Sequence, residues 1–408
     1  MRSKICPNNS PWRLRYTRGN RCRSDAVMKN AALLAHIRQL CCLGLGGRAI
    51  MPALLRAVRE LVPADSAEFF WVDAHGEMTN HYAEQTLPPD VMDFYYRADA
   101  GGEHPFFASF RTRAAQSDPV TTLTVNDALR RTELYRSVLH HLGAEHALYC
   151  VIRERELVLG QLSLYRGKAR APFGVGERTA IANIVGYVAH GLDDSFGAAK
   201  HAAADPGYRD TDHHAMLTLE RDGTLRHCSS AARKLLQYVT LDSVNRGTVA
   251  QQDEAIRGLM RELADQLGAV FVQREDVAVA PPALVVTNRW GRFVLRAYWL
   301  TDDVRAVDAL IGVQIRRQEP MVLRLSQAMQ RLALSPQQGE VGLLLAQGKS
   351  NPEIACALGV SLNTANYHVK QLFARLNTHE RAEVAPMLLG MGDGAMRNRG
   401  APLSAARG

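Results

Sequence analysis

The chain has 408 residues, of which 47% are apolar and 22% charged, and its formal net charge is +8. It is long enough for two or three domains with cores of their own, and no uninterrupted apolar run of eighteen residues predicts a membrane span. Seven cysteines without a CxxC pair argue against a disulfide framework and indicate a reducing compartment, the cytoplasm.

The positive charge is concentrated at the amino terminus. Residues 1–27 carry a net charge of +6, so the remaining 381 residues sum to +2. We expect 1–27 to be disordered, or untranslated with Met28 as the first residue, because so charged a segment buries little apolar surface. A basic arm that grips DNA phosphates is the alternative.

Residues 28–196 predict a first α+β unit. The expected elements are a helix from Met28 up to Pro63, strand pairs over 67–83 and 145–167, and helices over 88–99, 125–143 and 174–192. Gly76 would turn the first strand pair, and Gly143 would end the middle helix. This order, with its closing stretch "APFGVGERTAIANIVGYVAHGL", resembles a GAF-type sensor domain.

A second unit is expected over 214–318, after a small, polar linker at 197–213. It opens with a strand, an Asp-Gly turn, a strand and a helix capped by Ser229 or Ser230, a layout similar to the opening of a PAS domain. A helix over 251–267 and strands within 283–300 and 308–317 would complete an antiparallel sheet.

Residues 319–333 carry an apolar stripe that predicts a connecting helix. The stripe suits pairing with a second subunit, and it suits packing within the chain equally well. Residues 391–408 are expected to form a flexible tail.

The triplet Gly348-Lys349-Ser350 raises the question of a nucleotide-binding loop. Such a loop needs another glycine where this chain has Leu343, and a strand before it, whereas the preceding residues predict a helix capped by Ser335. Gly348 then falls where a left-handed residue ends that helix. The ATP-binding interpretation fails, and with it the best reason to expect an enzyme.

The next capping signals define a pair of helices. Ser350 and Glu353 form a capping box that starts a helix, Gly359 ends it, and Ser361 caps a longer helix. Cys356, within the first of these helices, is expected to be buried. Two helices joined by a tight glycine turn form a helix-turn-helix, whose second helix suits the major groove of DNA.

The outward face of the second helix is rich in amides. Its members are Asn363, Asn366, Tyr367, Lys370 and Gln371. Asn and Gln pair with adenine, and Lys contacts guanine or a phosphate. A plain solvent face would carry more Glu–Lys pairs at four-residue spacing, so the sequence favours DNA contacts here.

Residues 334–384, with "AQGKSNPEIACALGVSLNTANYHVKQLFARL" at their centre, closely resemble the LuxR/GerE-type helix-turn-helix domain of bacterial transcription regulators. The resemblance implies an all-α, four-helix domain over 334–390 that binds DNA as a dimer through its last helix, about His379 to Leu389. The outward face of the second helix and the family resemblance together predict which residues contact DNA: Lys349, Asn363, Thr364, Asn366, Tyr367, His368, Lys370 and Gln371. The chain departs from the family at Ala365, at Asn366 and at Asn377-Thr378.

The expected partners follow from this resemblance. The segment 334–384 has no net charge, so its nonspecific DNA affinity is expected to be weak unless a dimer or the basic termini contribute. Besides double-stranded promoter DNA, we expect a homodimer, an unidentified small-molecule effector and, if the protein is an activator, RNA polymerase. No cofactor or membrane partner is expected. A protein-interaction module without DNA binding is the rival interpretation.

The N-terminal half is expected to sense a signal. Trp71, Tyr95 and Tyr96 loosely resemble the ligand cluster of acyl-homoserine-lactone-responsive quorum regulators, although ordinary core packing explains them too. His140, His141 and His146 lack partners at metal-ligand spacing, so no metal site is predicted. The expected fold is multidomain: α+β sensor domains with antiparallel sheets, then an all-α helix-turn-helix domain.

Overall fold

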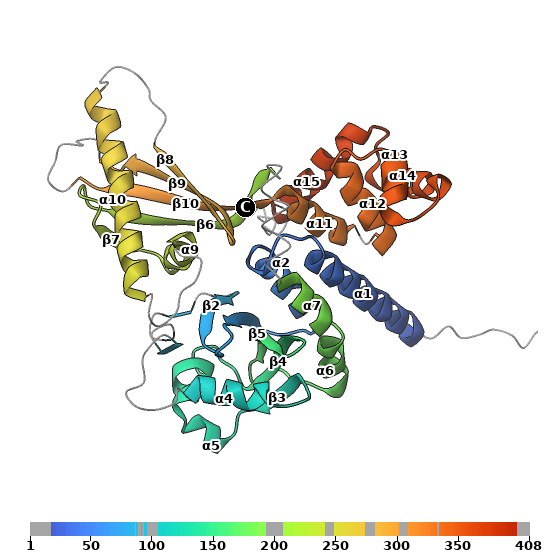
Figure 1. The fold of residues 1–408 in the computed structure, drawn as a ribbon, viewed down its shortest axis with the longest axis horizontal. Coiled ribbons are helices and arrows are strands. Elements are labelled where there is room, and N and C mark those ends of the chain that lie inside the picture. Colours follow the sequence, from blue (N-terminus) through green and yellow to red (C-terminus); the bar gives the residue numbers. More distant parts are fainter. Residues whose placement is uncertain are drawn as a thin grey trace, which may run out of the picture.

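Two five-stranded antiparallel sheets and a C-terminal helical domain make up the protein (Figure 1). The computed structural model describes residues 18–85, 87–88, 91, 94–95, 105–192, 207–240, 249–273, 282–301, 309–332 and 334–397. The expected architecture, α+β units with antiparallel sheets followed by an all-α domain, is confirmed.

Two helices precede the first sheet. α1 (Arg18–Cys41) and α2 (Gly47–Leu61) divide the single helix expected up to Pro63. The break coincides with Gly44 and Gly46, whose φ angles of 68° and 82° are left-handed. Because α1 begins at Arg18, the backbone of 18–27 is helical, which corrects the disorder expected there; residues 1–17 lie outside the described part.

The first sheet has the strand order β2-β1-β5-β4-β3. Its strands are β1 (Ser66–Val72), β2 (Met78–Ala83), β3 (Val120–Thr124), β4 (His146–Glu154) and β5 (Leu157–Arg166). Both expected strand pairs are present, and Gly76 has the left-handed φ of 77° that its turn requires.

Helices cover both faces of this sheet. α1, α2, α6 (Val175–Ala182) and α7 (Val185–Leu192) pack on one face, and α4 (Pro105–Ala114) packs on the other, with α5 (Asp127–Arg130) and the π-helical turn Tyr135–Leu139 beyond it (Figure 1). The last two replace the continuous helix expected over 125–143, and α6 and α7 divide the one expected over 174–192. Of the helix expected over 88–99, only Val91, Phe94 and Tyr95 are described.

A buried polar network lies on the α4 face. Glu68, 1% exposed, accepts a hydrogen bond from the hydroxyl of Tyr165 and lies 3.2 Å from Nε2 of His81. Arg113 donates from Nε to Oε1 of Gln161 at 2.8 Å. Because buried polar groups cost free energy when they are unpaired, these bonds fix the strands in one register.

The second sheet has the strand order β7-β6-β10-β9-β8. When the strands are numbered within each unit, both sheets have the order 2-1-5-4-3. Its strands are β6 (Tyr208–Leu219), β7 (Leu225–Cys228), β8 (Ala283–Asn288), β9 (Gly291–Trp299) and β10 (Ile311–Pro320). α9 (Ser230–Thr240) and α10 (Val249–Gln273) cover its inner face. Ser229 caps α9, since its Oγ accepts from Ala232 N at 3.1 Å.

Two expected boundaries differ from the structure. β6 begins at Tyr208, so 208–213 belong to the second sheet, because their backbone pairs with the end of β10; they are not linker. The last helix, α15, runs from Arg381 to Arg397, so the backbone of 391–397 is helical rather than part of a tail. The remaining residues of the expected linker and tail lie outside the described part.

The connecting helix is α11 (Met321–Arg331). Leu323 packs into the core shared by the two sheets, while Leu325 and Met329 pack into the core of the C-terminal domain. The apolar stripe is therefore covered within the chain, which supports the packing interpretation over subunit pairing. No helix of the described residues is long and apolar enough to cross a membrane.

Candidate nucleic-acid interface

The Gly348-Lys349-Ser350 triplet joins two helices. α12 (Pro336–Ala346) precedes it, and Gly348 has a φ of 81°. Ser350 caps α13 (Asn351–Leu358): its backbone N–H donates to Glu353 Oε2 at 2.8 Å, and its Oγ accepts from Glu353 N at 3.4 Å. The predicted helix end at Gly348 and the predicted N-cap at Ser350 are therefore both present. A nucleotide-binding loop would need a strand where α12 lies.

A tight turn leads from α13 to the second helix, α14 (Leu362–Leu376). Gly359 ends α13 in the left-handed conformation, with φ 63°, and Ser361 Oγ accepts from Thr364 N at 3.1 Å. This Gly-containing connection between two capped helices is a helix-turn-helix. Local capping chemistry alone sets both helix ends.

One face of α14 packs against the rest of the domain. Ala365, Val369, Leu372 and Leu376 are buried in a core with α11, α12, α13 and α15. The opposite face exposes Asn363, Tyr367, Lys370 and Gln371, which follow one another at helical spacing. Tyr367 is 60% exposed, so a large aromatic ring stands in water on the face predicted to contact bases.

Asn366 has a different environment from the one predicted. It is half-buried, and its Oδ1 accepts from Asn351 Nδ2 at 2.7 Å. Arg381 in turn donates to the side chain of Asn351 and to the backbone oxygen of Lys349. Asn351 therefore links α13 to α14 through Asn366 and to α15 through Arg381, while the base contact of Asn366 stays a prediction.

Thr364 and His368 are also half-buried. The Thr364 hydroxyl lies 2.8 Å from that of Ser361 and completes the cap of α14. The imidazole of His368 stacks edge-on against Tyr367 at 5.6 Å, and its Nδ1 has no hydrogen-bond partner among the described residues. Both lie at the border of the exposed face, as the flanking role implied by the family requires.

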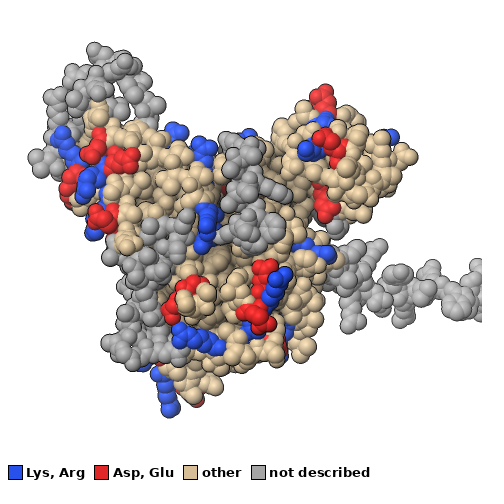
Figure 2. Space-filling view, in the orientation of Figure 1, with Lys and Arg blue, Asp and Glu red and all other residues tan. Residues whose placement is uncertain are grey.

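The charge on the domain is mixed. Lys349 lies 3.5 Å from Glu353, one helical turn away, and both side chains are about half exposed. Lys370 is exposed and makes no ion pair within the described residues. On the face seen in Figure 2, the helical domain shows acidic and basic side chains side by side rather than one positive patch.

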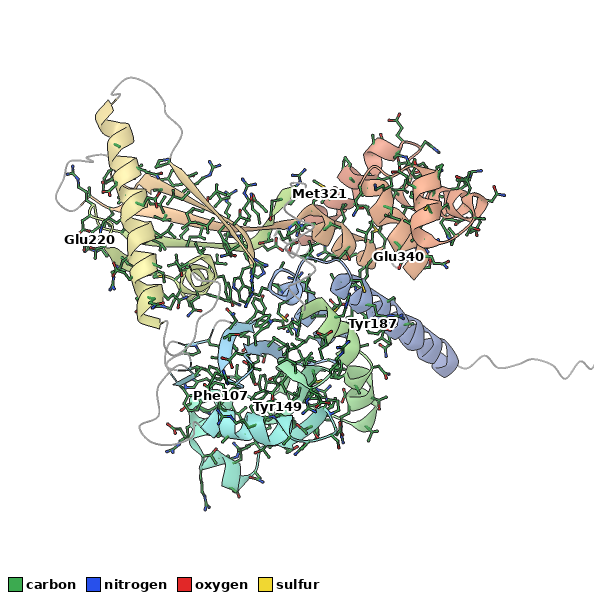
Figure 3. All side chains as sticks on the ribbon, viewed as in Figure 1. Phe107, Tyr149, Tyr187, Glu220, Met321 and Glu340 are labelled. Carbon is green, nitrogen blue, oxygen red and sulfur yellow. The ribbon has the colours of Figure 1, made fainter. Side chains whose placement is uncertain are left out.

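Among the described residues, the contacts of the helical domain with the N-terminal units are made by helices other than α14. The domain docks through α11 and α12 on α1, where Ser326 Oγ donates to Gln39 Oε1 at 3.2 Å. A groove of about 330 Å³ lies alongside this contact, with Tyr187 of α7 and Glu340 of α12 on its two sides (Figure 3). α14 lies at the far side of the domain (Figure 1).

The predicted ligand residues do not form one site. Trp71 belongs to the core on the α2 side of the first sheet, whereas Tyr95 packs with Phe106 on the α4 side. Successive residues of a strand point to opposite faces, so the sheet itself separates the two rings. Tyr96 lies outside the described residues.

Two further expectations concern single side chains. Cys356 is exposed rather than buried, because α13 turns Ile354 and Ala355 inward and leaves the next position in water. His140, His141 and His146 lie around the end of the π-helical turn and the start of β4; the described residues contain no group of three or more His, Cys, Asp or Glu suited to a metal ion.

Comparison with known proteins assigns the C-terminal region. Residues 332–388 match the family model for bacterial regulatory proteins of the luxR family. The chain is 41% identical over 56 residues to the putative HTH-type transcriptional regulator YhjB of Escherichia coli K12; this covers 14% of the chain and 28% of the relative's length.

Solved structures give weaker likenesses. The phycoerythrobilin-bound GAF domain of a cyanobacterial phytochrome aligns at 14% identity and a TM-score of 0.31, over 42% of this chain and 97% of that one. Escherichia coli SdiA aligns at 12% identity and a TM-score of 0.22, over 83% of this chain and 91% of that one. The capped helices, the exposed face of α14 and the family match agree that residues 332–388 are a helix-turn-helix domain of the luxR family of bacterial regulatory proteins.

Proposed function

We propose that this chain is a DNA-binding transcriptional regulator and not an enzyme. Its C-terminal domain reads promoter DNA in the major groove through α14, and its N-terminal units receive the signal. The observation that carries the proposal is the exposed face of Asn363, Tyr367, Lys370 and Gln371 on a helix whose opposite face is buried. Amides and a lysine at helical spacing match the donor and acceptor pattern of base edges.

The proposal extends to partners. The domain core uses Val384 and Leu388 of α15, so a homodimer would pair through the remaining surface of that helix. A dimer doubles the phosphate contacts, which a domain without net charge needs. Such a regulator works in the cytoplasm, and as an activator it would also contact RNA polymerase.

Footprinting of fragmented bacterial genomic DNA with the purified full chain would identify the operator and its half-site spacing together. On that operator, Lys370→Ala should weaken binding roughly tenfold, about 1–2 kcal/mol, because one base or phosphate contact is lost. Fluorescence anisotropy at two salt concentrations measures the effect. Circular dichroism should stay native, since Lys370 is exposed.

Lys168→Ala is the matched control, an exposed lysine in the first unit that should leave the affinity unchanged. Equal operator affinity in the Lys370→Ala and Lys168→Ala variants would reject the assigned face. If the full chain shows no salt-dependent DNA binding at all, the helical domain serves protein contacts instead.

A further inference from the structure

A cleft of about 190 Å³ lies at the junction of the two sheet units, away from the helix-turn-helix domain. The end of β2 and the residue after it form one side, with Tyr82 and Glu84; α9, the β8–β9 turn and β10 form the other. At roughly 30 Å³ per water, its volume equals about six waters, or one single-ring molecule. A macromolecule cannot enter it.

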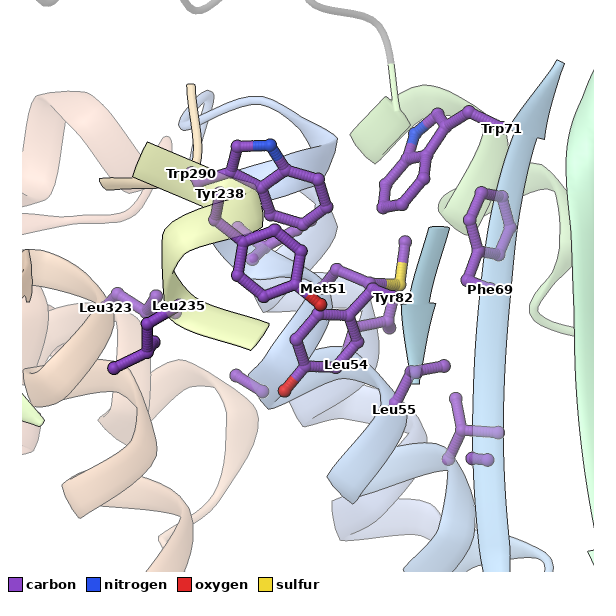
Figure 4. Packing of buried hydrophobic residues seen from close by; sticks show 14 of the residues in the cluster. Met51, Leu54, Leu55, Phe69, Trp71, Tyr82, Leu235, Tyr238, Trp290 and Leu323 are labelled. Atoms are coloured by element: carbon purple, nitrogen blue, oxygen red, sulfur yellow. The ribbon is translucent and has the colours of Figure 1, made fainter. Parts of the chain in front are cut away.

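Three aromatic rings form one wall of the cleft. Tyr238 stacks on Trp290 at 4.3 Å between ring centroids, and Tyr82 lies 5.9 Å from Tyr238 at an interplanar angle of 29° (Figure 4). Asn288 fixes the first two, since its Nδ2 donates to Tyr238 O at 2.7 Å and its Oδ1 accepts from Trp290 N at 2.9 Å. A planar ring is the ligand that stacks best on such a wall.

Trp290 also holds an unused donor. The side chain is 1% exposed, and its indole Nε1–H has no hydrogen-bond partner among the described residues. A buried N–H without an acceptor costs free energy of about 1–3 kcal/mol. A ligand oxygen in the cleft would supply the acceptor that the protein does not.

Two buried cations, Lys234 and Arg317, line the cleft. Lys234 is largely buried and donates to the backbone oxygens of Ala83 and Glu84, the latter at 3.2 Å, which among the described contacts leaves one of its three hydrogens for another acceptor. Arg317, 3% exposed, donates to Trp290 O at 2.7 Å and to Ala49 O at 3.3 Å. Two carboxylates line the cleft as well: Glu84 lies 3.0 Å from Nε of Arg59, and Asp212 is exposed.

The pKa values of Lys234 and His213 reflect burial and the charges around the cleft. Burial lowers the pKa of Lys234 to about 8; the charge of Glu84 opposes this shift and the charge of Arg317 adds to it. Burial, followed by the charges of Arg317, Lys234 and Arg56, lowers the pKa of His213 to about 3, so the cations around this imidazole keep it neutral. An anion in the cleft would relieve the repulsion among these cations.

The strand next to the cleft is irregular. Arg316 and Gln318 of β10 pair with His214 and Asp210 of β6, so three residues of β6 stand opposite Arg317 alone. Such a bulge redirects side chains, and here it brings His213 to the cleft. The junction is thus shaped by a local departure from the sheet's regular pairing.

We propose that this cleft binds a small planar aromatic anion, an arene carboxylate, with its ring on Tyr238 and Trp290 and its carboxylate toward Lys234. The effect on transcription rests on the proposed function: β10, which carries Arg317, continues without a loop into α11, whose Leu325 and Met329 lie in the core of the helix-turn-helix domain.

Isothermal titration calorimetry of the full chain with benzoate tests the site. Saturable binding is expected, and Lys234→Met should weaken it at least about tenfold, the usual loss for a hydrogen bond to a charged group. Lys168→Met, on the surface, should bind as the wild type does. Benzamide, which has no charge, and cyclohexanecarboxylate, which has no flat ring, should each bind several-fold more weakly.

Trp290→Phe keeps one six-membered aromatic ring and removes the five-membered ring with its N–H, so it should weaken benzoate several-fold even if the Lys234 variant does not fold. No saturation with benzoate, or equal affinity in the Lys234→Met and Lys168→Met variants, would overturn the proposal. Operator binding measured on the same preparation separates the two ideas: binding of DNA without benzoate rejects only the cleft, and binding of benzoate without DNA rejects only the regulator.

Discussion

The two sheets follow the same strand order and yet differ in what covers them. In β5 of the first sheet every residue from Gly160 to Arg166 is buried, whereas in β9 of the second sheet Phe293, Leu295 and Ala297 are buried and alternate with more exposed residues. Helices lie on both faces of the first sheet and on one face of the second. An antiparallel sheet tolerates water on one face. Two sheets with the same strand order can therefore differ in which of their residues are buried.

The difference also affects where polar and aromatic side chains lie. The closed first sheet carries its polar network inside, where Glu68, His81 and Tyr165 satisfy one another. The second sheet presents its open face to water and its aromatic edge, Tyr238 and Trp290, to the first unit. The proposed cleft lies where the first unit, with helices on both faces of its sheet, meets the second.

The largest expected contrast is between two glycines. In Gly160→Ala the new Cβ would meet the backbone oxygen of Phe70 and the Phe69 ring, whereas in Gly312→Ala it would meet the exposed side chain of Leu300, 2.8 Å away. We expect Gly160→Ala to cost about 3 kcal/mol or more of unfolding free energy, because a paired strand cannot move aside, and Gly312→Ala less than about 1 kcal/mol.

Urea unfolding of both glycine variants, followed by circular dichroism, measures this contrast. Equal losses would mean that the two sheets are covered alike in solution. A native-like Gly160→Ala protein would show that the β1–β5 pairing is looser than the structure indicates.

A smaller contrast is expected between two tyrosines. Tyr165→Phe removes the donor to buried Glu68 and should cost about 1–3 kcal/mol, because a buried carboxylate loses a partner. Tyr298→Phe, on the open face and 38% exposed, should cost less than about 0.5 kcal/mol. Thermal unfolding ranks the pair, and a reversed order would contradict the covered and open assignments.

The smallest effect concerns pH at the junction. Because burial and neighbouring cations lower the pKa of His213 to about 3, its neutral form favours the folded state, while the unfolded chain titrates near pH 6.5. Its contribution is complete above about pH 6.5 and is lost as the pH falls toward 3. Between about pH 6.5 and 4.5 we expect a loss on the order of 1–2 kcal/mol, after allowance for partial exposure.

The free energy of unfolding as a function of pH measures this loss. His213→Gln should flatten the acid slope, and His75→Gln, an exposed histidine in the β1–β2 turn, should retain it. Matching slopes in His213→Gln and the wild type would place the acid sensitivity elsewhere, for example at His36, whose pKa burial lowers to about 4.

The helix-turn-helix could be predicted from the sequence because its signals are local. Ser335, Ser350 and Ser361 cap their helices with residues three positions later, and Gly348 and Gly359 end them by left-handed φ angles. Such interactions operate within one helical turn, so a linear pattern contains them. The exposed face of α14 followed from the same periodicity.

Only the tertiary structure decided which polar side chains of this domain face solvent. Asn366 has the spacing of an outward residue, but its amide bonds to Asn351, which Arg381 holds from a helix thirty residues further on. The sequence shows that Asn351, Asn366 and Arg381 are present, but it does not show that their side chains meet.

The N-terminal half shows the same division. Alternating apolar residues and turn glycines predicted most of the strands, but not the separation of Trp71 from Tyr95 by a sheet, nor the meeting of Lys234, Trp290 and Tyr82. Sequence by itself determined the elements and the family of the C-terminal domain, because capping and periodicity act over a few residues. Long-range packing determined the junction and its charge, because burial depends on which surfaces meet.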